Sequence, residues 1–513
     1  MRTIGDWIRI HSYRSPSTEA FVGVDGRVTF GEAAERAWQL ARGLRASGVE
    51  IGDPVGVLAG NTVFNAEVFL GVGMSGGLYA AYNWRWAAEE LALNVRESLV
   101  KLIIVEDRFS EVLNVALDLI EASGAEFERP RVIHQGEVDF LRTGEGETED
   151  LVTANDGLCL IYTGGSTGAS KAVVLSHGAA TANAINERMD LGIGDPEHER
   201  GLMVTPMFHS AGLITWLFTH FAAGKTTILV DKFDESEFVD WVGRERATNS
   251  FMIPNMMRRL MQAGAFHDVD VQRYFTAMHT GAGLLRMPNK REFLEVMPRA
   301  RLFYRYGLSE GGPMVTRLHH NDILDESVDG SIGQEYSLAE TKLAAIDGSG
   351  EPVPTGELGE IIVRGPNVMT GYFNNPAATA DTIIDGWLHT GDLAVRDERG
   401  FYFFKDRLKE MIKTGGENVY CAEVEQVLYL HHAVLEAAVV GVANEEWGEE
   451  VRAVVSLRDG AVTTPEELSD HLRAHLAGYK VPKQFVFMPA EQLPRSGAGK
   501  LVKERLKSDL GWL

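Results

Sequence analysis

The chain has 513 residues, of which 45% are hydrophobic and 24% charged, as expected for a globular protein with a sizeable core and about three domains, or one large and one small. Asp and Glu number 73 against 49 Lys and Arg, so the formal net charge is −24. This acidic balance and the lack of a Lys/Arg-rich run argue against nucleic acid as a partner.

The first third of the chain predicts alternating helices and strands. At 28–49, VTFGEAAERAWQLARGLRASGV, apolar residues recur at helical spacing behind the capping residue Thr29, and a glycine ends the helix. Short buried strands are expected at 55–60 and 101–107, and a helix leading into a small-residue strand at 66–82. This alternation favours parallel sheets with helices packed on them.

A loop rich in glycine and hydroxyl groups follows in YTGGSTGASKAVVLSH, residues 162–177. The segments 158–163 and 172–176 on either side are typical of strands, and a helix begins only near Ser176 or His177. The loop could bind phosphates, hold a nucleophilic serine at Ser166, or serve only as a tight turn. The alternatives can be compared by what surrounds them.

Two known motifs, the P-loop and the nucleophile elbow, fit this loop poorly. A P-loop requires Gly before its lysine and Ser or Thr after it, whereas Lys171 lies between Ser170 and Ala172. A nucleophile elbow requires a helix directly after the serine, whereas a strand follows here. The favoured interpretation is a loop that donates backbone N–H groups and hydroxyls to phosphate oxygens, with Lys171 supplying positive charge. A serine acyl hydrolase that uses Ser166 remains an alternative of another class.

The centre of the chain repeats the alternating pattern. The segment 201–224 contains no Asp, Glu, Lys or Arg and is long enough for about one bilayer span. It carries Pro206, His209 and His220, so we interpret it as a buried, ligand-lining segment, with a transmembrane helix as the lesser alternative. We next expect a strand at 226–233, a helix at 235–247 and a second strand at 249–255.

The character of the sequence changes twice in its last third. After about residue 330, short strands separated by Gly and Pro turns predict a compact β unit. From about residue 408, a helix at 422–431, strands at 434–443 and 450–459 and a helix at 464–476 predict a separate domain of about 100 residues.

The cysteines and the amino terminus bear on the compartment. The two cysteines, Cys159 and Cys421, form neither a disulfide framework nor a cysteine-rich metal site. The first residues, MRTIGDWIRIHSYR, are interrupted by charges and lack the apolar core of a signal peptide. We therefore expect a cytoplasmic protein without a transmembrane segment.

Motifs in a fixed order give the sequence a resemblance to a known family. YTGGSTGASKAVVLSH is similar to the phosphate-loop signature of the adenylate-forming enzymes, which include acyl-CoA synthetases, luciferases and adenylation domains of peptide synthetases. Its departures from the common Y-T-S-G-T-T-G-x-P-K-G form are Gly164, Ser166, Ser170 and Ala172. PMFH (206–209) resembles the family's gate motif beside the acyl pocket. The other segments that resemble family motifs are HTGAGLL (279–285), YGLSE (306–310), GELGEIIVRGPNVMTGYFNNP (356–376), GWLHTGDLAVRDERGFYFFKDRLKEMIKTGGENVYCAEVE (386–425) and LPRSGAGKLVK (493–503).

The resemblance implies both a fold and a reaction. The fold is α/β, with a large N-terminal domain of sheets, helices and a small β-barrel at 1–407, and a small mobile C-terminal α+β domain at 408–513. The implied enzyme is an AMP-forming acyl-CoA synthetase. A carboxylate attacks the α-phosphorus of ATP to give acyl-AMP and pyrophosphate, and the thiol of coenzyme A then displaces AMP. An acyl-AMP ligase that loads an acyl carrier protein is the nearest alternative, and a homodimer is one option for assembly.

Site residues follow from the resemblance by motif. It implies catalytic roles for Lys500, Glu310 and His209, magnesium binding by Glu310 and Thr163, a hinge at Lys409, and a coenzyme A tunnel at Gly415, Gly416 and Arg85. Lys500 would bridge the substrate carboxylate and ATP, where positive charge and positioning are needed. The implied ATP contacts are Thr163, Gly164, Gly165, Ser166, Thr167, Gly168, Lys171, Gly281, Ala282, Gly283, Arg305, Tyr306, Gly307, Ser309, Asp392, Arg407 and Lys500. Among them, the resemblance implies that Tyr306 and the glycine turn 281–283 lie against the adenine and that Asp392 accepts from the ribose hydroxyls.

The sequence also bears on the acid. Relatives that activate amino acids carry an Asp near the gate motif, whereas FHSAGLITW here has no acidic residue. The expected pocket segments 251–257, 279–285 and 307–314 are largely apolar and rich in methionine, which fills irregular apolar space. We therefore expect an apolar aliphatic, alicyclic or aromatic acid. Arg305 either meets a second polar group of that acid or faces solvent, two alternatives that the sequence leaves open.

Overall fold

The computed structural model describes residues 1–163, 170–194, 198–283, 285–347, 349–495 and 501–512. The predicted fold class, α/β with a small second domain, is confirmed. By its internal contacts the chain divides into unit 1, residues 1–342 and 362–390, and unit 2, residues 343–361 and 391–513. The division after residue 407 stays a prediction, because compactness does not test where a chain pivots.

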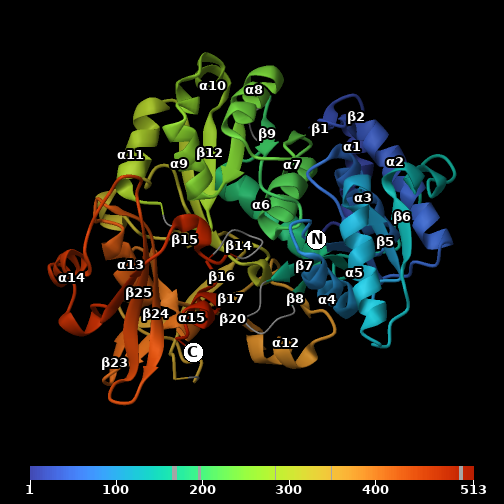
Figure 1. Cartoon of the computed structure of the whole chain (residues 1–513). Coiled ribbons are helices and arrows are strands. Elements are labelled where there is room, and N and C mark those ends of the chain that lie inside the picture. The colour runs from blue at the N-terminus through green and yellow to red at the C-terminus, as the bar shows by residue number, and fades with distance from the viewer. Residues whose placement is uncertain (164–169, 195–197, 284, 348, 496–500, 513) are drawn as a thin grey trace. The chain divides into compact units, whose positions relative to one another are not determined.

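Two large sheets organise unit 1 (Figure 1). Both are mainly parallel, with antiparallel strands at their edges. The described strands of the first, in spatial order, are β15 (Gln334–Glu335), β14 (Met314–Leu318), β13 (Arg301–Gly307), β12 (Ala277–Gly281), β11 (Asn249–Met252), β9 (Arg200–Met203), β10 (Thr226–Leu229), β1 (Glu19–Gly23) and β2 (Gly26–Thr29). Those of the second are β18 (Gly371–Tyr372), β8 (Lys171–Ser176), β7 (Gly157–Thr163), β4 (Leu78–Ala81), β3 (Pro54–Leu58), β5 (Leu102–Val105) and β6 (Arg131–His134).

The helices of unit 1 pack on these sheets and begin where the capping residues predict. Thr29 and Glu32 form a capping box at the start of α2, and Ser176 caps α6. The described helices are α1 (Ile4–Arg14), α2 (Phe30–Ala46), α3 (Val63–Ser75), α4 (Ala88–Ser98), α5 (Ser110–Ala122), α6 (His177–Leu191), α7 (Thr219–Ala222), α8 (Glu235–Glu245), α9 (Pro254–Gln262), α10 (Val269–Tyr274), α11 (Met287–Val296) and α12 (Pro376–Thr382).

The uncharged segment 201–224 is buried inside unit 1. It forms the end of β9, a π-helix at Ala211–Phe218, and α7. Trp216 and Phe218 of the π-helix are fully buried. None of the described helices is long and apolar enough to cross a membrane. The interpretation of this segment as a buried one is therefore confirmed.

A smaller sheet replaces the alternating pattern after residue 330, as predicted. Its described strands are β16 (Glu340–Ala344), β17 (Leu358–Arg364), β20 (Trp387–Arg396) and β19 (Ile383–Ile384), with β21 (Tyr402–Arg407) paired to β20. The division between the two units runs through these strands.

The rest of unit 2 has its own sheet and core. The described strands are β23 (Glu417–Val419), β22 (Ile412–Thr414), β25 (Gly448–Leu457), β24 (Val434–Asn444) and β26 (Gln484–Phe487), and the helices are α13 (Cys421–Leu428), α14 (Pro465–Arg473) and α15 (Lys503–Asp509). Alternate residues of β24 and β25 pack with α13 and α14 in one buried apolar cluster. The predicted helix–strand pattern of this region is confirmed (orange to red in Figure 1).

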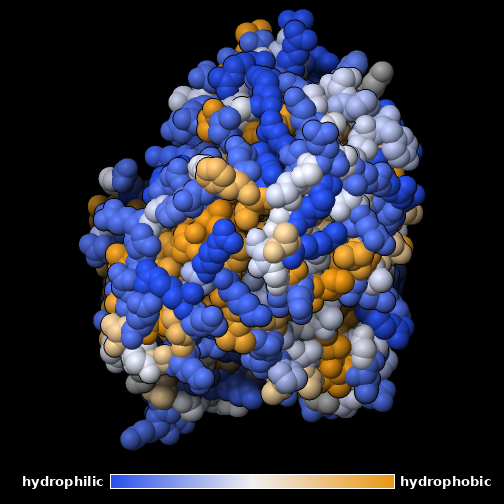
Figure 2. All heavy atoms as spheres, turned by 90° about the vertical axis from the view of Figure 1, so that its right-hand side faces the viewer, coloured by the Kyte–Doolittle hydropathy of each residue, from blue (hydrophilic) through white to orange (hydrophobic). Residues whose placement is uncertain are grey.

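The surface mixes apolar and polar residues. On the face seen in Figure 2, hydrophobic residues lie in patches between hydrophilic ones. Exposed apolar side chains of unit 1 include Leu93 of α4 and Val115 and Leu119 of α5. Exposed apolar side chains are common on the surface of a folded protein.

Candidate active site

The predicted phosphate loop joins two antiparallel strands. β7 and β8 form a hairpin in which Thr163 and Lys171 are paired, and the Thr163 hydroxyl donates to the Lys171 carbonyl over 3.3 Å. The strand-to-helix geometry of a nucleophile elbow is therefore not what surrounds Ser166. The loop residues themselves, Gly164, Gly165, Ser166, Thr167 and Gly168, lie outside the described residues, and so does Lys500.

Tyr372 brings the lysine of this hairpin close to the predicted magnesium ligand. The Lys171 ammonium lies 4.8 Å from the centroid of the Tyr372 ring, and the Tyr372 hydroxyl donates to Glu310 Oε1 over 2.9 Å. Burial and the neighbouring Glu310 charge raise the pKa of Tyr372, so its hydroxyl stays a donor. Sequence reasoning placed Tyr372 in a family motif but gave it no role.

The backbone around Glu310 is held by the same segment. Ser309–Gly311 is a short 3₁₀ turn after β13, and the Met369 N–H donates to the Glu310 carbonyl over 2.9 Å. The Asn367 side chain donates to the Gly311 carbonyl over 2.5 Å. The Glu310 side chain is therefore presented beside the hairpin by contacts from 367–372.

Glu310 suits Mg²⁺ as a ligand. Mg²⁺ prefers hard oxygen donors and commonly takes one or two carboxylates, with substrate phosphates and water in its other positions. Within the described ranges, no cluster of three or more His, Cys, Asp or Glu side chains could hold a metal by itself. A single carboxylate beside the hairpin that is predicted to bind phosphate fits such a shared site.

The predicted adenine side lies at the carboxyl ends of β12 and β13. Gly281 and Arg305 are neighbours in these parallel strands, and the Tyr304 hydroxyl donates to the Gly283 carbonyl over 2.8 Å. A Cβ at Gly281 would lie 2.4 Å from the Arg305 carbonyl oxygen. Close backbone approach at this turn therefore requires glycine. Ala282 follows with a left-handed φ of 60°.

Tyr306 and Arg305 point to opposite faces of β13, because successive side chains alternate along a strand. Tyr306 is half-buried and paired with Thr316, and Gly307 is exposed. Arg305 is 1% exposed and forms an ion pair with Glu187 of α6. The alternative that Arg305 faces solvent is therefore wrong.

The gate motif and the predicted coenzyme A residue lie in one aromatic cluster. The His209 and Phe208 ring centroids are 4.4 Å apart, and Arg85 Cζ lies 5.7 Å from the Phe208 ring and 4.8 Å from that of Trp84. Burial lowers the pKa of Arg85. Trp84, the residue before Arg85, therefore packs against its side chain.

A hydroxyl pair connects the gate to the turn that carries Glu310. The Ser210 and Ser309 hydroxyl oxygens are 2.9 Å apart. Ser210 directly precedes the π-helix and Ser309 follows β13. The gate residue His209 is thus brought near the predicted metal ligand within unit 1.

Unit 2 carries the predicted ribose and hinge residues. Asp392 and Arg407 are paired across β20 and β21, with Arg407 Nε 3.4 Å from Asp392 Oδ1. The Asp392 side chain is buried. Lys409 lies in the short helix Leu408–Glu410, and Gly415 and Gly416 form the turn between β22 and β23.

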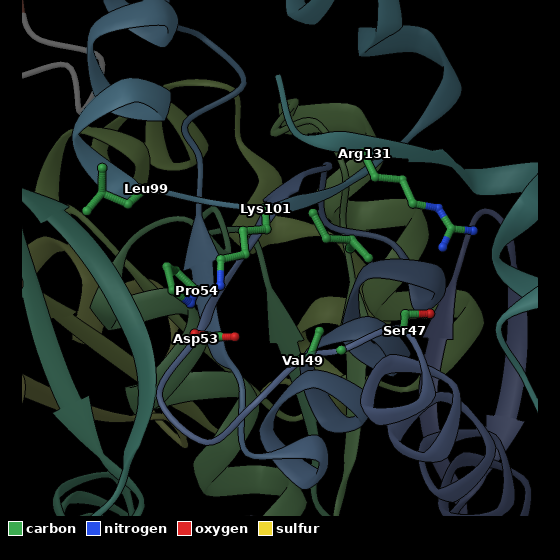
Figure 3. A pocket seen from close by; sticks show the side chains of 9 residues that line it. Ser47, Val49, Asp53, Pro54, Leu99, Lys101 and Arg131 are labelled. Carbon is green, nitrogen blue, oxygen red and sulfur yellow. The ribbon is translucent and has the colours of Figure 1, made fainter. Parts of the chain in front are cut away.

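A small pocket lies beside β3, β5 and β6 of the second sheet of unit 1, toward the edge opposite the β7–β8 hairpin (Figure 3). Its volume is about 90 Å³, and its lining includes Pro54, Leu102 and Arg131, the first residues of β3, β5 and β6. Lys101 extends toward Asp53 and Pro54. Ligands of parallel sheets bind at the carboxyl ends of the strands. This pocket is therefore separate from the predicted site.

Comparisons with known proteins place this geometry in a family context. Residues 8–373 match the model of the AMP-binding enzyme family, and residues 423–500 match that of the AMP-binding enzyme C-terminal domain. A feruloyl-CoA synthase of Amycolatopsis sp is 35% identical over 510 residues, covering 99% of both chains. A fatty acid–[acyl-carrier-protein] ligase of Streptomyces coeruleorubidus is 30% identical, covering 99% of this chain and 96% of its own.

A solved structure agrees over nearly the whole length. The o-succinylbenzoate CoA synthetase of Bacillus subtilis, in complex with its acyl-adenylate intermediate, has a TM-score of 0.85 and 28% identity. The match covers 98% of this chain and 97% of that one. The arrangement of elements described above is therefore shared with a protein that holds an acyl-adenylate.

Proposed function

The chain belongs to the AMP-binding enzyme family, and from this premise we propose how its residues carry out acid activation. It is an AMP-forming acid–thiol ligase that uses ATP, Mg²⁺ and coenzyme A. A carboxylate oxygen bonds to the α-phosphorus of ATP as pyrophosphate leaves. The thiol sulfur then bonds to the acyl carbon as AMP leaves, giving the thioester.

The observation that carries the assignment of the first step is the Lys171–Tyr372–Glu310 contact. It supports a role for Lys171 in holding ATP phosphates and for Glu310, with Thr163, in holding Mg²⁺. Bound there, Mg²⁺ offsets phosphate charge. Two anions must approach each other in this step, so fixed positive charge and positioning supply most of the catalysis.

The remaining proposed ATP contacts divide between the two units. In unit 1, Gly281, Ala282, Gly283 and Tyr306 surround the adenine, and Gly307 and Ser309 follow them. In unit 2, the buried carboxylate of Asp392 accepts from the ribose hydroxyls, and Arg407, which lies beside it, supports that carboxylate. Lys500 bridges the substrate carboxylate and ATP.

The second step uses a different set of residues in this proposal. Gly415 and Gly416 line the path of the pantetheine thiol, Lys409 is the hinge, and Arg85 contacts coenzyme A. His209 closes the acyl side. A carrier protein is the alternative acceptor, and its support is the fatty acid–[acyl-carrier-protein] ligase among the relatives.

The acid that we propose is apolar over most of its length. Its support is the apolar character of the expected pocket segment 251–257, in which Phe251 and Met252 are buried. The relatives named above act on an aromatic and an aliphatic acid, respectively. The test is pyrophosphate release from ATP and Mg²⁺ across a panel of both kinds of acid, with coenzyme A or a holo-carrier protein as acceptor. Release that does not depend on any acid contradicts the proposal.

A substitution of Lys500 tests which of the two steps this residue serves. The Lys500→Ala variant should form acyl-AMP more slowly by a factor of about 100 or more, yet convert supplied acyl-AMP and coenzyme A to thioester. The measurements are pyrophosphate release for the first step and thioester formation for the second. Equal loss of both steps would contradict the assignment of Lys500 to acid activation.

A serine hydrolase is not supported, because the loop that carries Ser166 joins two strands of a hairpin. For this alternative the discriminating variant is Ser166→Ala, which would have to abolish turnover without ATP. We further propose a cytoplasmic location, supported by the two buried, unbridged cysteines. A homodimer stays a prediction for sedimentation analysis.

A further inference from the structure

A buried ionic cluster lies between the first sheet of unit 1 and the helices that cover it. Arg305 Nη2 is 2.9 Å from Glu187 Oε2, and both side chains are fully buried. The other oxygen of Glu187 accepts from the Tyr336 hydroxyl over 2.8 Å. Arg305 Nη2 also donates to His279 Nδ1. These protein contacts use only one of the three guanidinium nitrogens.

The other guanidinium nitrogens lack acceptors. Arg305 Nε and Nη1 have no hydrogen-bond partner in the part of the chain that the structure describes, and neither does the indole nitrogen of Trp216. Arg305 Cζ lies 5.9 Å from the Trp216 ring and 5.6 Å from that of Phe251. Guanidinium and indole N–H groups can only donate. Buried donors without acceptors are costly and rare, so the cluster fits a ligand that brings an acceptor oxygen.

The charge of that oxygen is constrained by Glu187. Burial raises the pKa of Glu187 and the charge of Arg305 opposes this rise, while the 2.9 Å contact sets the two opposite charges against each other. Burial and the same charge hold the pKa of His279 well below its usual value, so the ring is neutral. Arg305 and Glu187 thus cancel each other. A ligand carboxylate would add an uncompensated buried charge, whereas a hydroxyl, ether or carbonyl oxygen would not.

The cluster lies on the acid side of the proposed site, away from the reacting end. The Ser210–Ser309 contact marks the end near Glu310. Arg305 lies in β13, four residues before Ser309, which corresponds to a distance of about 13 Å at most. Trp216 lies six residues after Ser210, within the π-helix. β13 and the π-helix therefore both connect the contact between Ser210 and Ser309 to the cluster.

We infer that the acid carries an uncharged hydrogen-bond acceptor at the end remote from its carboxylate, and that Arg305 Nε and Nη1 donate to it. This inference rests on the proposed function, because it names the substrate class of the same site. Glu187 acts as a positioning residue that sets the charge preference. A rigid aryl-propenoic acid with a para hydroxyl or methoxy group has the required chemistry.

The test compares acids of one shape that differ only at the remote end. The probes are para-hydroxy-, para-methyl- and para-carboxycinnamate, with ω-hydroxyoctanoate and nonanoate as the aliphatic pair, and the readout is kcat/KM for acid-dependent pyrophosphate release. The unmodified chain should prefer the hydroxy acid of at least one pair about 10- to 100-fold, and should discriminate against the para-carboxy acid. A KM difference with similar kcat is expected, because the contact is remote from the reacting atoms.

Two variants change the cluster in opposite ways. Glu187→Gln frees the charge of Arg305, so the ratio of para-carboxy to para-hydroxy activity should rise about 10-fold or more. Arg305→Met combined with Glu187→Gln removes both charges without leaving one unpaired, and its hydroxy-to-methyl ratio should fall to near one. The matched control, Lys290→Met with Asp329→Asn, removes a partly buried ion pair elsewhere in unit 1 and should leave all ratios unchanged.

The outcomes distinguish failure of this inference from failure of the proposed ligase function. Acid-dependent release with no hydroxy preference in either pair, or ratios that the Arg305/Glu187 variants leave unaltered, overturns the inference and leaves the ligase assignment intact. A rise of the para-carboxy ratio in Glu187→Gln supports the inference even where the double variant folds poorly. Absence of release with any acid contradicts both.

Discussion

Tyr372 shows how a site can depend on a residue that no motif singled out for chemistry. Its ring faces the Lys171 ammonium and its hydroxyl donates to Glu310. These partners are 201 and 62 residues away in the sequence, as the numbering shows. The family motifs predicted Lys171 and Glu310 separately, but the contact that joins them exists only once β18 pairs with β8.

Tyr372→Phe tests this contact. The ring and its contact with Lys171 remain, while Glu310 loses a hydrogen bond to a charged group, worth about 1.5–3 kcal/mol. We expect a lower rate of pyrophosphate release, by about 10-fold, and saturation at higher Mg²⁺ concentration. A Mg²⁺ titration of pyrophosphate release measures both. The exposed Tyr13 provides the control, Tyr13→Phe, and equal Mg²⁺ curves for the two variants would contradict the assignment.

His177 gives unit 1 a pH-dependent stability. The ring is fully buried, its Nδ1 accepts from the Ile4 N–H over 3.2 Å, and burial lowers its pKa from 6.5 to about 4. Between these values the unfolded chain binds the proton and the folded chain does not. Stability from this group is therefore complete above pH 6.5 and is lost as the pH falls toward 4.

The measurement is denaturant unfolding at pH 7.5 and pH 5.5 for the unmodified chain and for His177→Asn, whose side-chain oxygen replaces the acceptor. The unmodified chain should lose about 1 kcal/mol more than the variant at pH 5.5. Equal losses in both proteins would show that His177 does not carry this dependence.

At the scale of elements, the turn after β13 depends on a glycine that a larger residue cannot replace. Gly312 has a φ of 84°, and a Cβ there would lie 1.5 Å from the Asn367 carbonyl oxygen. A shift of this turn would also move Glu310, whose carbonyl accepts from Met369. The geometry of one loop against another therefore positions the proposed metal ligand.

Gly312→Ala should lower the free energy of unfolding by about 2 kcal/mol or more, because strain at positive φ adds to a backbone collision, and should abolish pyrophosphate release. Gly386→Ala is the matched control. It has a φ of 77° but no atom within 4 Å of the added Cβ, so it should cost about 1 kcal/mol with activity retained. Denaturant unfolding and pyrophosphate release compare the two. Similar effects would mean that φ alone, and not the contact, matters.

The elements were predictable where local rules act. The capping box of α2, the hairpin strands around the loop and the helix–strand pattern of unit 2 follow from periodicity and capping. The helix α11 was not predicted, because its sequence, MPNKREFLEV, has a weak apolar face. Whether Arg305 meets a polar group of the acid or faces solvent was left open, because its buried partner Glu187 lies 118 residues away in the sequence.

At the scale of the whole molecule, the order of the motifs along the chain predicted the family. Each motif is weak alone, whereas their sequence from the hairpin to the C-terminal segment led to the same family that the comparisons show. What the sequence could not supply is where long-range contacts bring the predicted residues together. The structure supplies this for Lys171, Glu310, His209 and Arg85 in unit 1, and for Asp392 and Arg407 in unit 2.

The central claim is that the acid reacts through acyl-AMP, and its most direct test follows one oxygen atom. The acid is labelled with heavy oxygen in its carboxylate and incubated with the enzyme, ATP, Mg²⁺ and coenzyme A, and the nucleotide product is analysed by mass spectrometry. The account predicts AMP that carries one labelled oxygen, together with pyrophosphate and the acyl thioester. Labelled inorganic phosphate with ADP, or thioester formed with unlabelled AMP, would contradict it.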